Sequence, residues 1–264
     1  MPTPSQIVLR PRQVVRALSA IALFLVFASV FTQLAAYLTG HDYMLGMIQL
    51  LDIDGERNLP TFFSGCLFLG GAALFLLVWR VRSQMIWLLL AGVFVFLAFD
   101  ELFQVHETLM RPIRERFHLS GFLYLAWVVV YGTAALALAV AFVRPWWQLP
   151  RRVRFWLAVS AATYLAGAIG FEMLGAPHWE ALERSGAGVD LLSSIYFTIE
   201  ESLEMAGLII LIHSLLLLLQ TERGGVAVVV PGISGVATDW TRGAGPRVRG
   251  GAESVVTPMI RKVG

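Results

Sequence analysis

The sequence predicts an all-α polytopic membrane protein: six transmembrane helices in a bundle, with both termini cytoplasmic. Three observations predict it. Of the 264 residues, 57% are hydrophobic and only 14% are charged, and the mean hydropathy is +0.71. Soluble domains usually carry about 25% charged residues, so most of this chain is expected to face lipid. Six apolar segments are long enough to cross a bilayer, and basic residues concentrate in alternate connections.

The six spans follow from segment length. A helix that rises about 1.5 Å per residue needs about 20 apolar residues to cross the hydrocarbon core. The predicted spans are 17–39, 60–79, 85–107, 121–143, 155–175 and 190–219. Pro60 suits the first turn of the second helix, and Pro145 and Pro150 end the fourth. Pro112 is expected to kink or end any extension of the third.

Arginine placement predicts the orientation. If the N-terminus is cytoplasmic, fifteen of the 20 lysine and arginine residues lie in the N-terminal segment, the second and fourth connections or the tail. Short cytoplasmic loops are enriched in these residues. We therefore expect a cytoplasmic segment at 1–16, a transmembrane domain at 17–219 and a Gly/Arg-rich cytoplasmic tail with little fixed structure at 220–264.

With this topology, all but three of the 18 acidic residues fall in outer loops or the outer halves of spans. The polar residues within or next to the spans are Asp100, Glu101, Gln104, His106 and Glu107 in DELFQVHE, Glu172 in FEMLG, and Glu200, Glu201 and Glu204 in EESLEMAG.

Helical periodicity predicts how these residues face. At about 100° per residue on one continuous helix, Asp100, Gln104 and Glu107 share a stripe. His106 then points about 120° away from Asp100, towards a different neighbour. Glu200 and Glu204 share a stripe with Gly207, which would allow close approach of another helix.

So many carboxylates near one another would repel unless they were protonated, paired with arginine or bound to a cation. Arg111, Arg114 and Arg116 lie too close to the outer surface to neutralise all of them. We therefore expect a divalent metal, either iron, manganese, zinc or calcium. The expected ligands are Glu101, His106, Glu172, Glu200 and Glu204, and the expected catalytic acids or bases are Asp100, Glu107 and Glu201.

Two other interpretations of the cluster stay open. The acids could line a wet outer vestibule and hydrogen-bond to one another, or form a proton or cation path. The paired Glu-x-x-His elements of di-iron and di-manganese bundles are missing from this sequence.

The segment LDIDGERNLPT carries acidic residues at alternate positions, Asp52, Asp54 and Glu56. An EF-hand is excluded, because the twelfth position holds Phe63 in place of a bidentate glutamate. The segment is either a polar turn that leads into Pro60, or a lid that supplies extra ligands to the acidic cluster.

Several cofactors and partners are excluded by what the spans lack. No span contains the lysine that retinal requires, and the span histidines, His106 and His213, are expected near opposite faces, which argues against haem. Cys66 is the only cysteine, so a cysteine-ligated iron–sulfur cluster within the chain is excluded. No basic helix with interleaved aromatics is present, so nucleic acid is not an expected partner.

The four segments LDIDGERNLPTFFS, DELFQVHE, FEMLG and EESLEMAG resemble a group of uncharacterised bacterial polytopic membrane proteins. The shared motifs are LDxDGExNLPT, DExxxxHE, FEM and EExxEMxG, and the resemblance covers residues 17–219. It implies a multi-pass protein of the bacterial inner membrane whose acidic residues belong to one pattern, and it implies no particular reaction.

The sequence thus favours a metal-dependent membrane protein that acts enzymatically on a lipid or small hydrophobic substrate. Its expected partners are membrane lipids. The alternatives are a proton or cation transporter component, and an accessory subunit that binds other subunits of a larger membrane complex.

Overall fold

The computed structural model of the chain describes residues 5–40, 46–53, 55, 57–223 and 226–230. It contains six helices that are long and apolar enough to cross a membrane, which confirms the predicted all-α bundle of six spans. They are α1 (Pro11–Thr39), α3 (Leu59–Arg82), α4 (Met85–Phe103), α6 (Trp127–Trp147), a helix over Arg151–Ser185, and α9 (Leu191–Arg223). Shorter elements connect them, namely α2 (Met47–Leu51), α5 (Val105–Phe117) and the 3-10 turn η2 (Gly121–Leu123).

The fifth span is longer than the predicted 155–175 and is not uniform. It consists of α7 (Arg151–Leu165), a π-helical turn η3 (Ala166–Phe171) and α8 (Glu172–Ser185). A π-helical turn widens the helix and rotates the residues that follow it. Here it immediately precedes Glu172.

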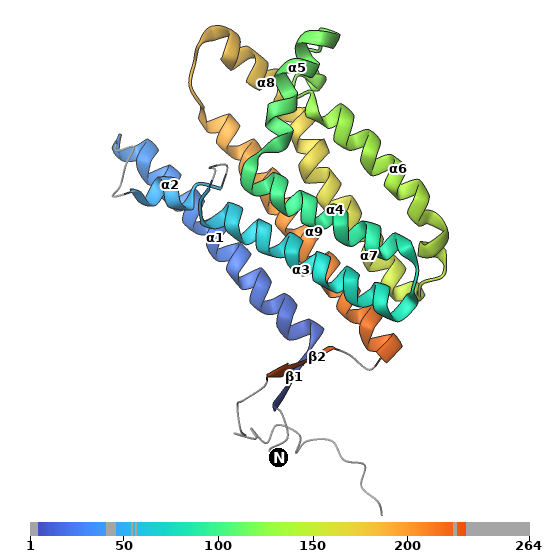
Figure 1. The fold of residues 1–264 in the computed structure, drawn as a ribbon. Helices are drawn as coiled ribbons and strands as arrows, with labels where there is room; N and C mark the ends of the chain where they lie inside the picture. Colours follow the sequence, from blue (N-terminus) through green and yellow to red (C-terminus); the bar gives the residue numbers. More distant parts are fainter. Residues whose placement is uncertain (1–4, 41–45, 54, 56, 224–225, 231–264) are drawn as a thin grey trace, which may run out of the picture. The chain divides into compact units, whose positions relative to one another are not determined.

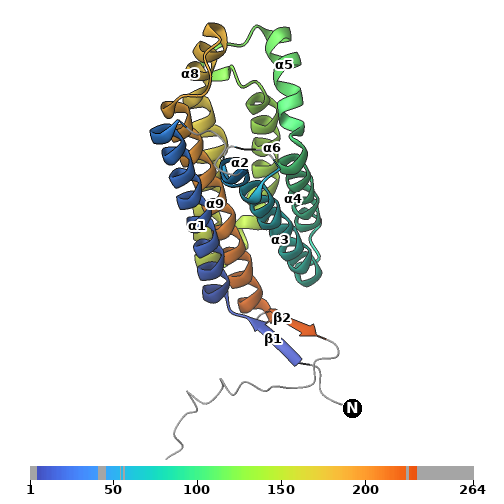
Figure 2. The same cartoon turned by 90° about the vertical axis from the view of Figure 1, so that its left-hand side faces the viewer.

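Helix α9 lies at the centre of the bundle, where it contacts α1, α3 and α7 (Figures 1 and 2). Helices α3 and α4 pack side by side as a hairpin. Edge-to-face contacts of Phe68 and Phe75 with Phe94 join these two helices, and Phe68 also contacts Tyr164 of α7. On the outer surface, large apolar side chains such as Phe27 and Leu38 are about 70% exposed. This outward apolar surface is what a lipid-embedded bundle requires.

The predicted helix at 85–107 is wrong in one respect, because it breaks at Gln104. Gln104 adopts the left-handed conformation, with φ of 51°, so α4 ends at Phe103 and α5 begins at Val105. Helix α5 then continues through Pro112 to Phe117. Asp100 and Glu107 therefore do not share a stripe on one continuous helix.

The fourth span also starts later than predicted, at Trp127 in place of 121. Gly121 has φ of 62° and opens the short turn η2, so the chain changes direction before α6 begins.

Two short strands, β1 (Ser5–Leu9) and β2 (Val226–Val230), pair as a two-stranded sheet. The predicted tail, 220–264, starts inside the last turn of α9, and its residues 231–264 lie outside the described part of the chain.

Asn58 caps α3, with Pro60 in the first turn. Its Oδ1 accepts from the Thr61 backbone N–H at 3.1 Å, and its Nδ2 donates to the Asp52 carbonyl at 2.6 Å. Loss of an asparagine cap costs about 1 kcal/mol. We expect Asn58→Ala to lower the unfolding free energy by that amount in a chemical denaturation measurement. Asn58→Asp keeps the oxygen that accepts from Thr61 but loses the amide donor to the Asp52 carbonyl. If it lowers the unfolding free energy as much as Asn58→Ala does, the donor contributes more than the cap.

Candidate functional site

Helices α7 and α9 approach each other unusually closely at two glycines. A Cβ on Gly207 would lie 2.7 Å from the backbone N and the Cβ of Tyr164. A Cβ on Gly167 would lie 2.7 Å from the Glu200 carbonyl oxygen and 3.1 Å from the Glu204 Cγ. The prediction that Gly207 permits close helix packing is thus confirmed. The two contacts hold the acidic turn of α9 against the π-helical turn.

Glu172 begins α8 and connects two other spans. Its Oε1 accepts a hydrogen bond of 2.8 Å from the indole Nε1 of Trp127 on α6. Its carboxyl group also lies close enough to that of Glu200 on α9 to interact with it. Two ionised carboxylates at such close range repel each other unless a proton or a cation lies between them.

Glu204 and Glu101 extend this cluster. Glu204 interacts with Tyr164 of α7, with Glu101 of α4 and with Glu172. Glu200 is buried, while the other three glutamates are partly exposed. We call Glu101, Glu172, Glu200 and Glu204 the glutamate cluster. Its members come from α4, α8 and α9.

Asp100, His106 and Tyr131 form a second group beside the glutamate cluster. Asp100 Oδ1 accepts from the His106 backbone N–H at 2.8 Å and from the Tyr131 hydroxyl at 3.0 Å. Asp100 Oδ2 lies 3.0 Å from His106 Nδ1. The prediction that His106 points away from Asp100 is therefore wrong. The left-handed Gln104 breaks the helix, so that Asp100 binds the first turn of α5 and orients the imidazole.

His106 is the cationic partner in this region. Burial disfavours its charged form, but the hydrogen bond and charge of Asp100, with Glu107 and Glu172, outweigh burial and raise the pKa of the imidazole. Its ring lies 5.1 Å from that of Trp127, and Trp127 meets Tyr131 edge-to-face at 5.3 Å. Helix α6 thus supplies an aromatic wall with two hydrogen-bond donors.

The acidic residues nearer the ends of α5 and α8 form ion pairs and hydrogen bonds that join neighbouring elements. Arg114 makes contacts of 3.4 Å with Glu183, which also accepts from the Tyr124 hydroxyl. Burial and this hydrogen bond raise the pKa of Tyr124 to about 12. Glu180 binds Arg184 and the Gly121 backbone N–H. These contacts fasten η2 and α5 to α8, so they are structural.

Asp190 is likewise a helix cap. It accepts from the Ser193 backbone N–H at 2.9 Å and hydroxyl at 2.7 Å, and both its oxygens lie within 3.0 Å of His178 Nε2. The hydrogen bond to His178, followed by those to Ser193, lowers the pKa of the carboxyl group.

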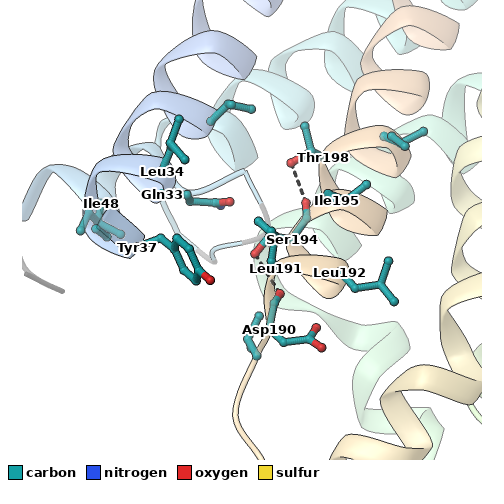
Figure 3. Close-up of a pocket in the computed structure, with 14 residues that line it drawn as sticks. Gln33, Leu34, Tyr37, Ile48, Asp190, Leu191, Leu192, Ser194, Ile195 and Thr198 are labelled. Carbon is teal, nitrogen blue, oxygen red and sulfur yellow. Dashed lines mark hydrogen bonds between the residues drawn. The ribbon is translucent and has the colours of Figure 1, made fainter. Parts of the chain in front are cut away.

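A groove of about 1160 Å³ lies between α1, α2 and the start of α9 (Figure 3). Gln33 and Tyr37 face Leu191 and Thr198 across it. At about 100° per residue, the groove face of α9 is nearly opposite the face of Glu200 and Glu204. The groove and the glutamate cluster therefore lie on different sides of α9.

The remaining predicted site residues lie around these groups. Glu107 is exposed in the first turn of α5, where its Oε1 lies 3.4 Å from Gln104 Nε2. Glu201 is partly exposed on α9 and interacts electrostatically with Glu200. Asp52 accepts from the Gln33 amide at 2.7 Å. Asp54 and Glu56 lie outside the described residues.

The sequence did not predict a place in the site for Trp127, Tyr131 or Tyr164. One signal was available: Trp127 and Tyr131 are four residues apart and so share a helix face. No local signal identifies Tyr164, whose place depends on the close approach at Gly207.

The donors present are carboxylates and an imidazole, which suit iron, manganese or zinc. Over the described ranges, however, no three His, Cys, Asp or Glu side chains are already arranged to hold a metal ion.

Three comparisons with known proteins were made, and one of them gave a match. Neither a search of curated proteins nor a search of solved structures gave a match. A match to a protein family spans residues 17–219, which contain the six helices' apolar cores and every residue of the two polar groups described above. The chain belongs to the family described as "Domain of unknown function (DUF8692)".

Proposed function

We propose that the glutamate cluster binds a divalent cation in exchange for protons, and that this centre serves a reaction on a lipid or small hydrophobic molecule. The observation that carries the proposal is the close approach of Glu172 to Glu200, with Glu204 and Glu101 alongside, in a group of four glutamates from three helices. Among the described residues, no lysine or arginine forms an ion pair with these four glutamates. Protons keep such a site neutral until a cation replaces them.

The side chains around the cluster fit this role. Glu172, Glu200, Glu204 and Glu101 would hold the cation after a change of rotamer, and His106 would complete the donor set. Asp100 and Tyr131 act as positioning residues, because their contacts orient His106. Glu107 and Glu201 remain the candidates for general acid or base. When bound, the cation would supply Lewis-acid polarisation or redox chemistry.

The position of helix α6 beside the glutamate cluster supports this substrate class. Helix α6 provides the aromatic wall, and Val128 is the one buried side chain in its described length. A hydrophobic molecule arriving through lipid would meet Trp127 and Tyr131 first. The proposal retains a bacterial inner membrane location with both termini cytoplasmic, on the strength of the arginine distribution.

The test is titration of the purified, chelator-treated protein with Mn²⁺, Fe²⁺, Zn²⁺ and Ca²⁺, by calorimetry in buffers of different ionisation enthalpy. We expect binding with net proton release for at least one ion. Glu200→Gln, which keeps the shape but not the charge, should weaken binding by about 100-fold. Glu115→Gln, an exposed residue paired only with Arg111 in the described structure, is the matched control. Absence of binding by all four ions would refute the proposal.

A second candidate is a proton relay. It is favoured by the hydrogen-bonded sequence from Tyr131 through Asp100 to His106, beside the Glu172–Glu200 pair. Two results together would favour this function over the first. The protein would bind none of the four ions, and proteoliposomes would show a proton flux that is lost in Glu200→Gln.

A further inference from the structure

At the other end of the bundle, arginines gather where α1 begins, α7 begins and α9 ends. A pocket of about 600 Å³ is lined by Arg10, Arg12 and Arg16 of the α1 start, Arg152 of α7, and His213 and Gln220 of α9. Arg12 and Arg152 both act electrostatically on His213, which places their charges close to one another. Within the described residues, none of the four arginines forms an ion pair.

The backbone adds to this positive field. Helix α1 starts at Pro11 and α7 at Arg151, and neither has a capping side chain or an acidic residue in its first turn. The start of α1 lines the pocket, so its helix dipole adds to the charge of the arginines, and α7 contributes Arg152 of its first turn. Helix N-termini bind phosphate through exposed backbone N–H groups and the helix dipole.

His213 lines the pocket beside the arginines. Its imidazole is held edge-to-face against Trp156, with ring centres 5.6 Å apart. This contact fixes the ring in the wall of the pocket.

We propose that this pocket binds a phosphate group, as carried by an anionic phospholipid headgroup or by a free phosphate ester. Four guanidinium groups and the dipole of α1 supply the positive charge, and His213 lies in the wall of the pocket. Basic pockets between transmembrane helices bind anionic headgroups in this way. Further along α1, the exposed side chains Leu23, Phe24 and Phe27 offer an apolar surface for acyl chains.

The experiment compares the purified full-length chain in nanodiscs of phosphatidylcholine alone and with phosphatidylglycerol, by native mass spectrometry and thermal unfolding. The test variant is Arg12→Gln/Arg152→Gln. The matched control is Arg111→Gln/Arg116→Gln, which removes equal charge from α5. We expect phosphatidylglycerol binding to fall about 30-fold in the test variant, at about 1 kcal/mol per arginine, and to stay unchanged in the control.

A second arm uses lipid-free detergent solutions of inorganic phosphate and glycerol 3-phosphate. Stabilisation by either, lost in the test variant, identifies a free phosphate ester as the ligand. Response to phosphatidylglycerol alone identifies a lipid headgroup. Equal effects of the test and control variants, or no preference for phosphatidylglycerol together with no response to phosphate, would overturn the proposal.

Discussion

Gly207→Ala is expected to destabilise the bundle by about 3 kcal/mol and to abolish the response to divalent cations. The new methyl group would lie 2.7 Å from the backbone N and the Cβ of Tyr164. Backbone atoms cannot move aside as a flexible side chain can, so α7 and α9 must separate. Overpacking of this kind costs about 1–3 kcal/mol and sometimes more. Separation would also draw Glu200 and Glu204 away from Glu172.

The control is Gly92→Ala on α4, where an added Cβ meets nothing within 4 Å. Alanine favours helix by up to about 1 kcal/mol over glycine, so this variant should be as stable as the parent or slightly more so. Thermal unfolding in detergent, with and without Mn²⁺, measures both effects. Equal stability of the two variants would contradict the close packing of α7 on α9.

Asp100→Asn is the second substitution with a large expected effect. Asp100 has only 8% of its side chain exposed and binds His106 twice and Tyr131 once. Removal of the charge leaves a partly buried imidazolium without its counter-ion, and breaking such a pair costs about 3 kcal/mol. We expect that loss at pH 6, measured by denaturant unfolding in the presence of a chelator.

The pH dependence tests the cause of that loss. The pKa of His106 is raised in the folded protein above its unfolded value of about 6.5. The resulting stability is therefore fully present below pH 6.5 and is lost as the pH rises through the folded pKa. The difference between parent and Asp100→Asn should shrink between pH 6 and pH 9. His118→Gln, at an exposed position, should leave the pH profile unchanged, and a constant difference across this range would show that charge is not the cause.

The sequence predicted the six spans because bilayer thickness dictates the length and composition of any helix that crosses it. Their ends were less predictable. The break at Gln104 depends on Asp100 binding residues beyond the turn, whereas the letters DELFQVHE on their own favour a continuous helix. Likewise, nothing in AGAIGF distinguishes a π-helical turn from an α-helical one, since small residues are common to both.

In the candidate site, too, some features could be predicted from the sequence and others could not. Periodicity was sufficient to place Glu200, Glu204 and Gly207 on one stripe, because all three lie on an unbroken helix. It failed for His106, because the helix breaks at Gln104, between Asp100 and the imidazole. The part played by Tyr164 could not be predicted, because it depends on how closely two distant spans approach.

Helix α6 buries a single side chain of its own in the described structure, yet two of its polar atoms bind Asp100 and Glu172. Attraction between apolar helices is weak in lipid, so these two hydrogen bonds carry an outsized share of the attachment of this span. Both acceptors are titratable carboxyl groups. Their ionisation therefore affects the strength of these hydrogen bonds, and with it the packing of α6 on the bundle. Assembly of the fourth membrane-crossing helix and the ionisation of the acids inside the bundle are therefore linked equilibria.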